Sequence, residues 1–255
     1  MSRIRQAFDG RLFVTRSDTP GIYELDPATG VVLRQFGTYR FGGLPSVIME
    51  MSPDRRTLYV SDRGYGSLER YDLTVAGTPA LLQRIEFESH VPLGRIVVSP
   101  DGASVAVLTN TGSGASQPIV FRATNDLTQV VRTYAAPAQV VDVTFSADGS
   151  ELFIGLNSSI HVYDTATGTL KESLSLPNGI ETAGIPYTIA IDPAGMRLFV
   201  TARGTFSGYR VYTIRRAAPP FPGPHRRLLN VSTRLKSYGK PFFFALYSMS
   251  SENLK

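Results

Sequence analysis

Short apolar runs recur along the first 214 residues of the chain at a nearly constant spacing. Each run holds three apolar residues, and successive runs begin 46 or 47 positions apart. They occupy positions 12–14, 58–60, 105–107, 152–154 and 198–200. Short apolar runs bounded by turn residues are typical of buried β-strands. Because the period is fixed and long, the pattern predicts five copies of one supersecondary unit.

A turn sequence precedes four of the five runs. These turns lie at 52–55, 99–102, 146–149 and 192–195, and the first copy keeps only Asp9 and Gly10. Proline presets the first corner of a tight turn, aspartate bonds its own backbone, and glycine accepts a positive φ. We therefore assign the repeated acids Asp54, Asp101 and Asp148 to hairpin turns, because a catalytic acid is needed once per protein and not once per repeat.

Each copy contains three further segments with strand character. An apolar strand opened by proline precedes the turn, and a strand that tends to end in an aromatic residue and an acid, such as Tyr163 and Asp164, follows the run. A second turn and another strand complete the copy. Four short strands in a period of 40–50 residues indicate a propeller blade. The predicted fold is all-β, a β-propeller of about five four-stranded blades.

The repeat also resembles a known family. The unit Ser-Pro-Asp-Gly, Leu-Tyr-Val-Ser and Tyr-Asp-Thr-Ala-Thr-Gly is similar to the YVTN-type β-propeller repeats of bacterial proteins, relatives of WD-repeat blades that lack the Trp-Asp signature. The chain contains no tryptophan. The resemblance covers about residues 8–214 and implies a fold more than a function, because such propellers serve as scaffolds, ligand binders, lactonases and subunits of redox enzymes.

Both terminal blades are expected to be incomplete. Residues 1–8 fit the first-strand pattern poorly, and the fifth copy ends near Ile214 before a fourth strand. The predicted organisation is therefore propeller repeats at 1–214, a linker rich in proline and arginine at 215–228, and a basic tail at 229–255, which resembles the start of a β-rich module. Two alternatives remain open: a closed ring of five blades, or part of a larger ring with exposed sheet edges.

Charge and composition exclude several classes of function. The net charge of +5 belongs to residues 215–255, whereas residues 1–214 carry 18 basic and 20 acidic residues, so the folded body lacks the basic surface that nucleic acid requires. Cysteine is absent, which excludes disulfides, thiolate metal sites and cysteine nucleophiles. The longest apolar run late in the sequence is too short to span a membrane. No signal peptide is visible; the sequence as written predicts a cytoplasmic protein, or an extracytoplasmic one if it is a fragment.

One loop position can be followed through all five copies, three residues past each apolar run. It holds Ser17, Arg63, Asn110, Asn157 and Arg203. Arg and Asn side chains facing one axis could bind an anionic or sugar-like ligand, although both residues also suit an ordinary turn after a strand. Glu181, in the longest loop between copies, is a further candidate. No pattern predicts a metal site, a cofactor or a catalytic residue.

Two functions of different classes fit these patterns. The regular repeat, without a singular reactive residue, favours a non-catalytic binding or scaffold module for a small ligand or a protein partner. The alternative is a sugar-lactonase-like hydrolase, implied by the resemblance, with Arg63, Arg203 and Glu181 over the central channel.

Overall fold

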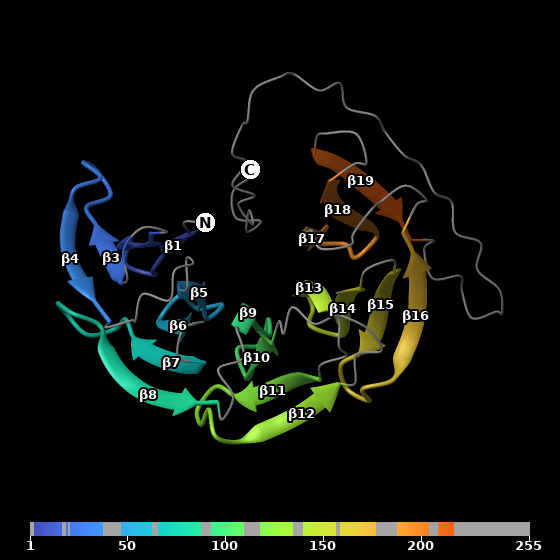
Figure 1. Cartoon of the computed structure of the whole chain (residues 1–255), viewed down its shortest axis with the longest axis horizontal. Coiled ribbons are helices and arrows are strands. Elements are labelled where there is room, and N and C mark those ends of the chain that lie inside the picture. The colour runs from blue at the N-terminus through green and yellow to red at the C-terminus, as the bar shows by residue number, and fades with distance from the viewer. Residues whose placement is uncertain are drawn as a thin grey trace, which may run out of the picture.

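Nineteen β-strands and no helix make up the described part of the chain. The computed structural model describes residues 3–16, 19, 21–37, 47–62, 66–87, 93–109, 118–134, 140–156, 159–176, 188–203 and 209–216. The strands form five separate antiparallel sheets, four with four strands and one with three. Figure 1 shows the sheets arranged in an arc around a common axis, with the first strand of each innermost. The predicted class, an all-β propeller of about five blades, is confirmed.

Each sheet is one blade, and its strands follow one another in sequence order. Blade 1 contains β1 (Arg3–Gln6), β2 (Leu12–Thr15), β3 (Ile22–Leu25) and β4 (Val32–Phe36). Blade 2 contains β5 (Val47–Met51), β6 (Thr57–Asp62), β7 (Ser67–Asp72) and β8 (Ala80–Glu86). Blade 3 contains β9 (Leu93–Val98), β10 (Ser104–Thr109), β11 (Ile119–Ala123) and β12 (Val130–Tyr134). Blade 4 contains β13 (Val140–Phe145), β14 (Glu151–Leu156), β15 (Ser159–Asp164) and β16 (Leu170–Ser175). Blade 5 contains β17 (Thr188–Ile191), β18 (Arg197–Arg203) and β19 (Tyr209–Arg215).

The sequence-based expectation that blade 1 lacks its first strand is wrong. Strand β1 pairs along its length with β2, and Arg5 lies opposite Phe13. The sequence pattern did not predict this strand because its charged residues interrupt the apolar pattern of a first strand. Arg5 tolerates this inner position because its guanidinium makes two hydrogen bonds to Glu50 of blade 2, at 2.8 and 2.6 Å.

Blade 5 has three strands within the described residues, and the expected end of the repeats near Ile214 stays a prediction. Strand β19 continues to Arg215, and the guanidinium of the next residue, Arg216, bonds Glu151 of blade 4 at 2.6 Å and Glu172 at 3.3 Å. The guanidinium carbon of Arg216 also lies over the aromatic ring of Phe153, 5.2 Å from the ring centroid. Arg216 thus fastens the end of blade 5 to blade 4.

The hydrophobic core lies between neighbouring blades. Because side chains alternate along a strand, each sheet presents one apolar face to the blade before it and another to the blade after it. At the first junction, Phe13, Ile22 and Phe36 of blade 1 pack against Met49 and other residues of blade 2, all buried. The other junctions repeat this arrangement: Phe153, Ile160 and Val162 of blade 4, for example, meet Leu198 and Val200 of blade 5.

The antiparallel order of each blade separates two rims of the propeller. The turns from first to second strand and from third to fourth strand lie at one rim, here called the turn rim. The connections from second to third strand, and from one blade to the next, join at the opposite rim, here called the loop rim.

The turns from first to second strand share one hydrogen-bond pattern. In blade 2, the hydroxyl of Ser52 donates to Asp54 Oδ1 at 2.5 Å and accepts from the backbone N–H of Thr57 at 2.9 Å. Blades 3 and 4 repeat both bonds through Ser99 and Ser146. In blade 5 the carboxylate of Asp192 replaces the serine hydroxyl and accepts from two backbone N–H groups. These bonds confirm the assignment of the repeated acids to turns.

A buried carboxylate joins the inner strands of three blades. Asp142 of β13 is 1% exposed; it pairs with Arg95 of β9 and accepts the backbone N–H of Ile189 of β17 at 2.7 Å. A buried charge is tolerated only where such partners compensate for its lost hydration. Asp142 therefore fixes the relative position of blades 3, 4 and 5 near the axis.

Arg55 is expected to destabilise its turn. It has a φ of 58°, at the place where Gly102 and Gly149 have 70° and 72°. This left-handed conformation costs a residue with a Cβ about 1–2 kcal/mol. Substitution by glycine removes this cost, but glycine also makes the unfolded chain more flexible, which offsets part of the stabilisation. We expect Arg55→Gly to raise the free energy of unfolding by about 0.5–1 kcal/mol in denaturant titrations. The control Gly149→Ala should lower it, and a loss of stability in Arg55→Gly would contradict the assignment.

Replacing Asp142 is expected to destabilise the propeller strongly. Asp142→Leu leaves the Arg95 guanidinium without this carboxylate and the Ile189 N–H without its acceptor, a change that typically costs about 3–5 kcal/mol. The control is Glu86→Leu, because Glu86 pairs with Arg84 from an exposed position and its loss should change stability by less than about 1 kcal/mol. Denaturant unfolding of both variants measures the difference, and equal effects would show that Asp142 does not link the blades.

Candidate functional site

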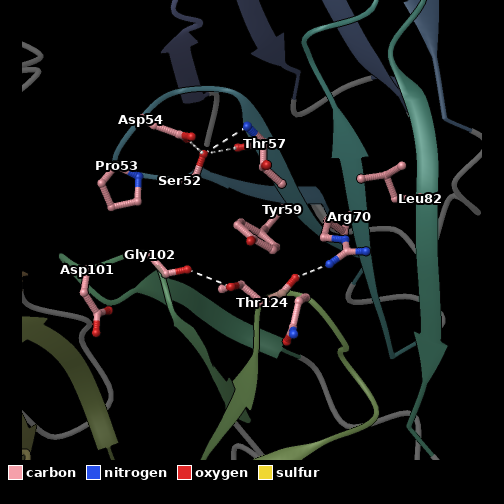
Figure 2. Close-up of a pocket in the computed structure, with 11 residues that line it drawn as sticks. Ser52, Pro53, Asp54, Thr57, Tyr59, Arg70, Leu82, Asp101, Gly102 and Thr124 are labelled. Carbon is pink, nitrogen blue, oxygen red and sulfur yellow. Dashed lines mark hydrogen bonds between the residues drawn. The ribbon is translucent and has the colours of Figure 1, made fainter.

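A cleft of about 410 Å³ opens between blades 2 and 3 at the turn rim. It is bounded by the turn between β5 and β6, the matching turn of blade 3, strands β6, β7 and β8, and the turn after β11 (Figure 2). The lining residues are Ser52, Pro53, Asp54, Thr57, Tyr59, Arg70, Leu82, Asp101, Gly102, Thr124 and Asn125. Two equivalent turns from neighbouring repeats thus lie on one concave surface.

Two carboxylates lie along one side of the cleft. Asp54 and Asp101 occupy the same position in their turns, and both are exposed. The hydroxyl of Ser52 holds the pKa of Asp54 below its ordinary value of 3.8, with a further bond from the Arg56 N–H, and Ser99 does the same for Asp101. Both groups are therefore ionised at neutral pH.

The guanidinium of Arg70 supplies a positive charge at the opposite side of the cleft. Arg70 of β7 is half-buried and donates from one guanidinium nitrogen to the backbone carbonyl of Thr124. Figure 2 shows this nitrogen directed at Thr124 and the opposite nitrogen pointing away from it. The Nε atom is buried without a hydrogen-bond partner, and among the described residues no carboxylate forms an ion pair with Arg70. The terminal guanidinium nitrogen that points away from Thr124 thus remains for an anionic group.

The remaining walls combine an aromatic and an aliphatic side chain. Tyr59 of β6 is buried, which raises the pKa of its hydroxyl, while the charge of Arg70 acts in the opposite direction. Leu82 of β8 is half exposed. The hydroxyl of Thr124 donates to the Gly102 carbonyl at 2.7 Å and fixes the turn after β11 against the turn of its own blade. The cleft therefore presents charges of both signs beside apolar surface.

The two carboxyl groups of the cleft are poorly matched to general acid–base chemistry near neutral pH. A general acid or base works best with a pKa near the working pH, whereas both carboxyl groups have lowered pKa values. Among the described residues no three His, Asp or Glu side chains lie close enough together to hold a metal ion. His161 of β15 has its pKa lowered by burial, and its Nδ1 is buried without a partner.

The structure does not describe the side chains of the site residues predicted from the sequence. Arg63, Asn110, Asn157 and Glu181 lie outside the described residues. Arg203 is the last residue of β18, where its backbone pairs with Tyr209, and its side chain lies outside the description. The described strands that flank these positions end at the loop rim, opposite the cleft. The ring of Arg and Asn side chains stays a prediction.

The sequence did not predict a binding role for the residues of the cleft. By strand register, Arg70 occupies the place that Glu24, Phe121 and Val162 hold in other blades. This departure from the repeat was the signal that could have identified it. Arg70 lies within a strand, whereas the ligand-binding residues predicted from the sequence lie in the loops after each apolar run and in the loop that contains Glu181.

Comparisons with known proteins identify the fold and no family. No protein-family model matches the sequence, and no curated protein matches it in a sequence search. The structure is similar to Kuenenia stuttgartiensis hydrazine synthase, with a TM-score of 0.65 and 18% identity over 84% of this chain and 62% of that one. It is also similar to the Myceliophteria thermophila Cps50 (Swd1) β-propeller domain, with a TM-score of 0.61 and 16% identity over 89% of this chain and 70% of that one.

These similarities identify the fold as a β-propeller and do not identify a family or a function. Identities below one fifth leave the predicted YVTN-type family unconfirmed, and the chain spans less than two thirds of the hydrazine synthase chain. Over the ranges that the structure describes, no helix has the length and apolar character needed to cross a membrane.

The pKa of Asp54 tests the geometry of the cleft. Ser52→Ala removes the strongest cause of the lowered pKa, so we expect the value to rise toward 3.8 in NMR titration. Because the folded pKa is depressed, the ionised carboxylate stabilises the fold above pH 3.8, and this stabilisation is lost as the pH falls through the folded pKa. The stability difference between wild type and Ser52→Ala should therefore shrink in acid. Ser99→Ala is the control and should shift Asp101 alone; an unchanged Asp54 in Ser52→Ala would contradict this geometry.

Proposed function

We propose that this chain is a non-catalytic binding module, a β-propeller that holds a peptide segment of a protein partner in the cleft between blades 2 and 3. The observation that carries the proposal is Arg70, a half-buried cation that uses one nitrogen to contact the neighbouring blade and has no carboxylate paired with it among the described residues. A ligand carboxylate there would form a charge-assisted hydrogen bond, which is roughly twice as strong as a neutral one.

The shape and chemistry of the cleft fit an extended peptide. Asp54 and Asp101 lie across from Arg70 and would attract a basic side chain, while Leu82 and Tyr59 offer apolar contact. A segment with an acidic and a basic residue would thus find complementary groups at both sides. Charges arranged in this way supply specificity more than affinity.

Arg132 is a matched control that distinguishes a role of Arg70 in ligand binding from a role in packing between blades. Arg132 of blade 3 makes the same kind of contact as Arg70, because it donates to the backbone carbonyls of Thr165 and Ala166 in blade 4. Arg132 does not line the cleft. Arg132→Gln therefore removes an equivalent contact between blades without changing the site.

Selection from a random-peptide display library tests the proposal. Peptides that bind the wild-type chain should be enriched in an acidic residue, and Arg70→Gln should weaken their binding by about 10- to 100-fold, since a hydrogen bond to a charged group contributes about 1.5–3 kcal/mol. Arg132→Gln should bind them as the wild type does. Equal affinity for the Arg70→Gln variant, or hydrolysis of sugar lactones by the wild-type chain, would refute the proposal.

A further inference from the structure

The two ends of the blade series leave sheet faces that are covered in every other blade. On blade 1, Ile4 is 55% exposed, and Leu12 and Val14 of the same face are half-buried. By register, the residues that correspond to Ile4 in blades 2 to 5 are at most 2% exposed. They are Met49, Ile96, Val143 and Ile189. The preceding blade covers this face in all four cases.

Blade 5 leaves open the other face of its sheet, the face that the following blade covers in blades 1 to 4. Val211 of β19 is 45% exposed, whereas its counterparts by register are at most 1% exposed. These counterparts are Ile22, Leu68, Ile119 and Ile160. Phe199, on the same face, is half-buried, although Phe13 and Phe153 at its position are fully buried. In blades 1 to 4 the following blade covers this face.

The two open faces are the two halves of one junction. Each junction inside the molecule joins the Phe13-type face of one blade to the Leu58- and Val60-type face of the next. Blade 5 carries the first type, through Phe199 and Val211, and blade 1 carries the second type. Figure 1 shows β1 and β17–β19 at opposite ends of the arc, on separate sides of its opening. Within the described residues, the open face of blade 1 and the open face of blade 5 do not meet.

We propose that these faces form an interface between copies of this chain, in which the open face of blade 5 packs on the open face of blade 1 of a second copy. The contact continues the packing that already joins successive blades, and each copy carries both halves. Such an interface is heterologous, with a different surface on each partner, so association proceeds head to tail and each copy can contact two others. The open face of blade 1 offers Ile4, Leu12 and Val14 as its apolar surface.

Two single substitutions and their mixture test this interface. Ile4→Glu blocks the face of blade 1 and Val211→Glu blocks the face of blade 5; both residues are exposed, so each variant should fold. We expect the molar mass of the wild-type chain, measured by light scattering during size-exclusion chromatography, to increase with concentration. Each variant alone should associate more than about tenfold more weakly, because contact would bury an unpaired carboxylate.

The mixture gives the sharpest outcome. Ile4→Glu keeps the blade 5 face and Val211→Glu keeps the blade 1 face, so equal amounts should form a heterodimer and nothing larger. Leu170→Glu, at an exposed position of β16, is the control and should associate as the wild type does. A wild-type chain that stays monomeric at high concentration, or variants that still associate alone, would overturn the proposal; so would a mixture that stays monomeric.

Discussion

The packing of each sheet against its neighbour is the interaction on which the whole structure depends. A blade of four short strands has two apolar faces, and no element of the same blade can cover either of them. Phe13 and Phe153 are completely buried because the following blade lies over them, whereas Phe199 at the same position of blade 5 is only half-buried. Stability is therefore expected to be a sum of contributions from blades and from the contacts between them, as in other repeat proteins.

The polar features of the molecule follow from the same constraint. The Asp142 carboxylate is accommodated in the interior because three blades meet around it and supply its partners, and Arg216 is held by two carboxylates of blade 4. The cleft also arises between blades, where the turns around Asp54 and Asp101 lie side by side without filling the space between them. Arg70 at this junction contacts blade 3 with part of its guanidinium. A binding site between blades thus needs few residues beyond those that hold the blades together.

The repeat could be predicted from the sequence because its determinants are local. Apolar triplets at a fixed period and Asp-containing turns require only neighbouring residues, and the hydrogen bonds of Ser52 and Asp54 act within one turn. Strand β1 could not be recognised, because the charge of Arg5 is compensated by Glu50, which is 45 residues away in sequence. The cleft was missed for a similar reason: its groups come from two repeats, and only the packing of blades brings Arg70 near Thr124. The candidates Arg63, Asn110, Asn157 and Glu181 lie outside the described residues and are still predictions.

Native-state hydrogen exchange tests most directly the claim that neighbouring blades stabilise one another. The second strand of each blade holds the buried apolar triplet, so its amide protons report on the opening of that blade. In dilute solution, β10 of blade 3 has covered faces on both sides, whereas β2 and β18 each belong to a blade with one open face. The account predicts that β2 and β18 exchange through openings of lower free energy than β10. Equal protection of all three strands would contradict it, because each blade would then be stable without its neighbours.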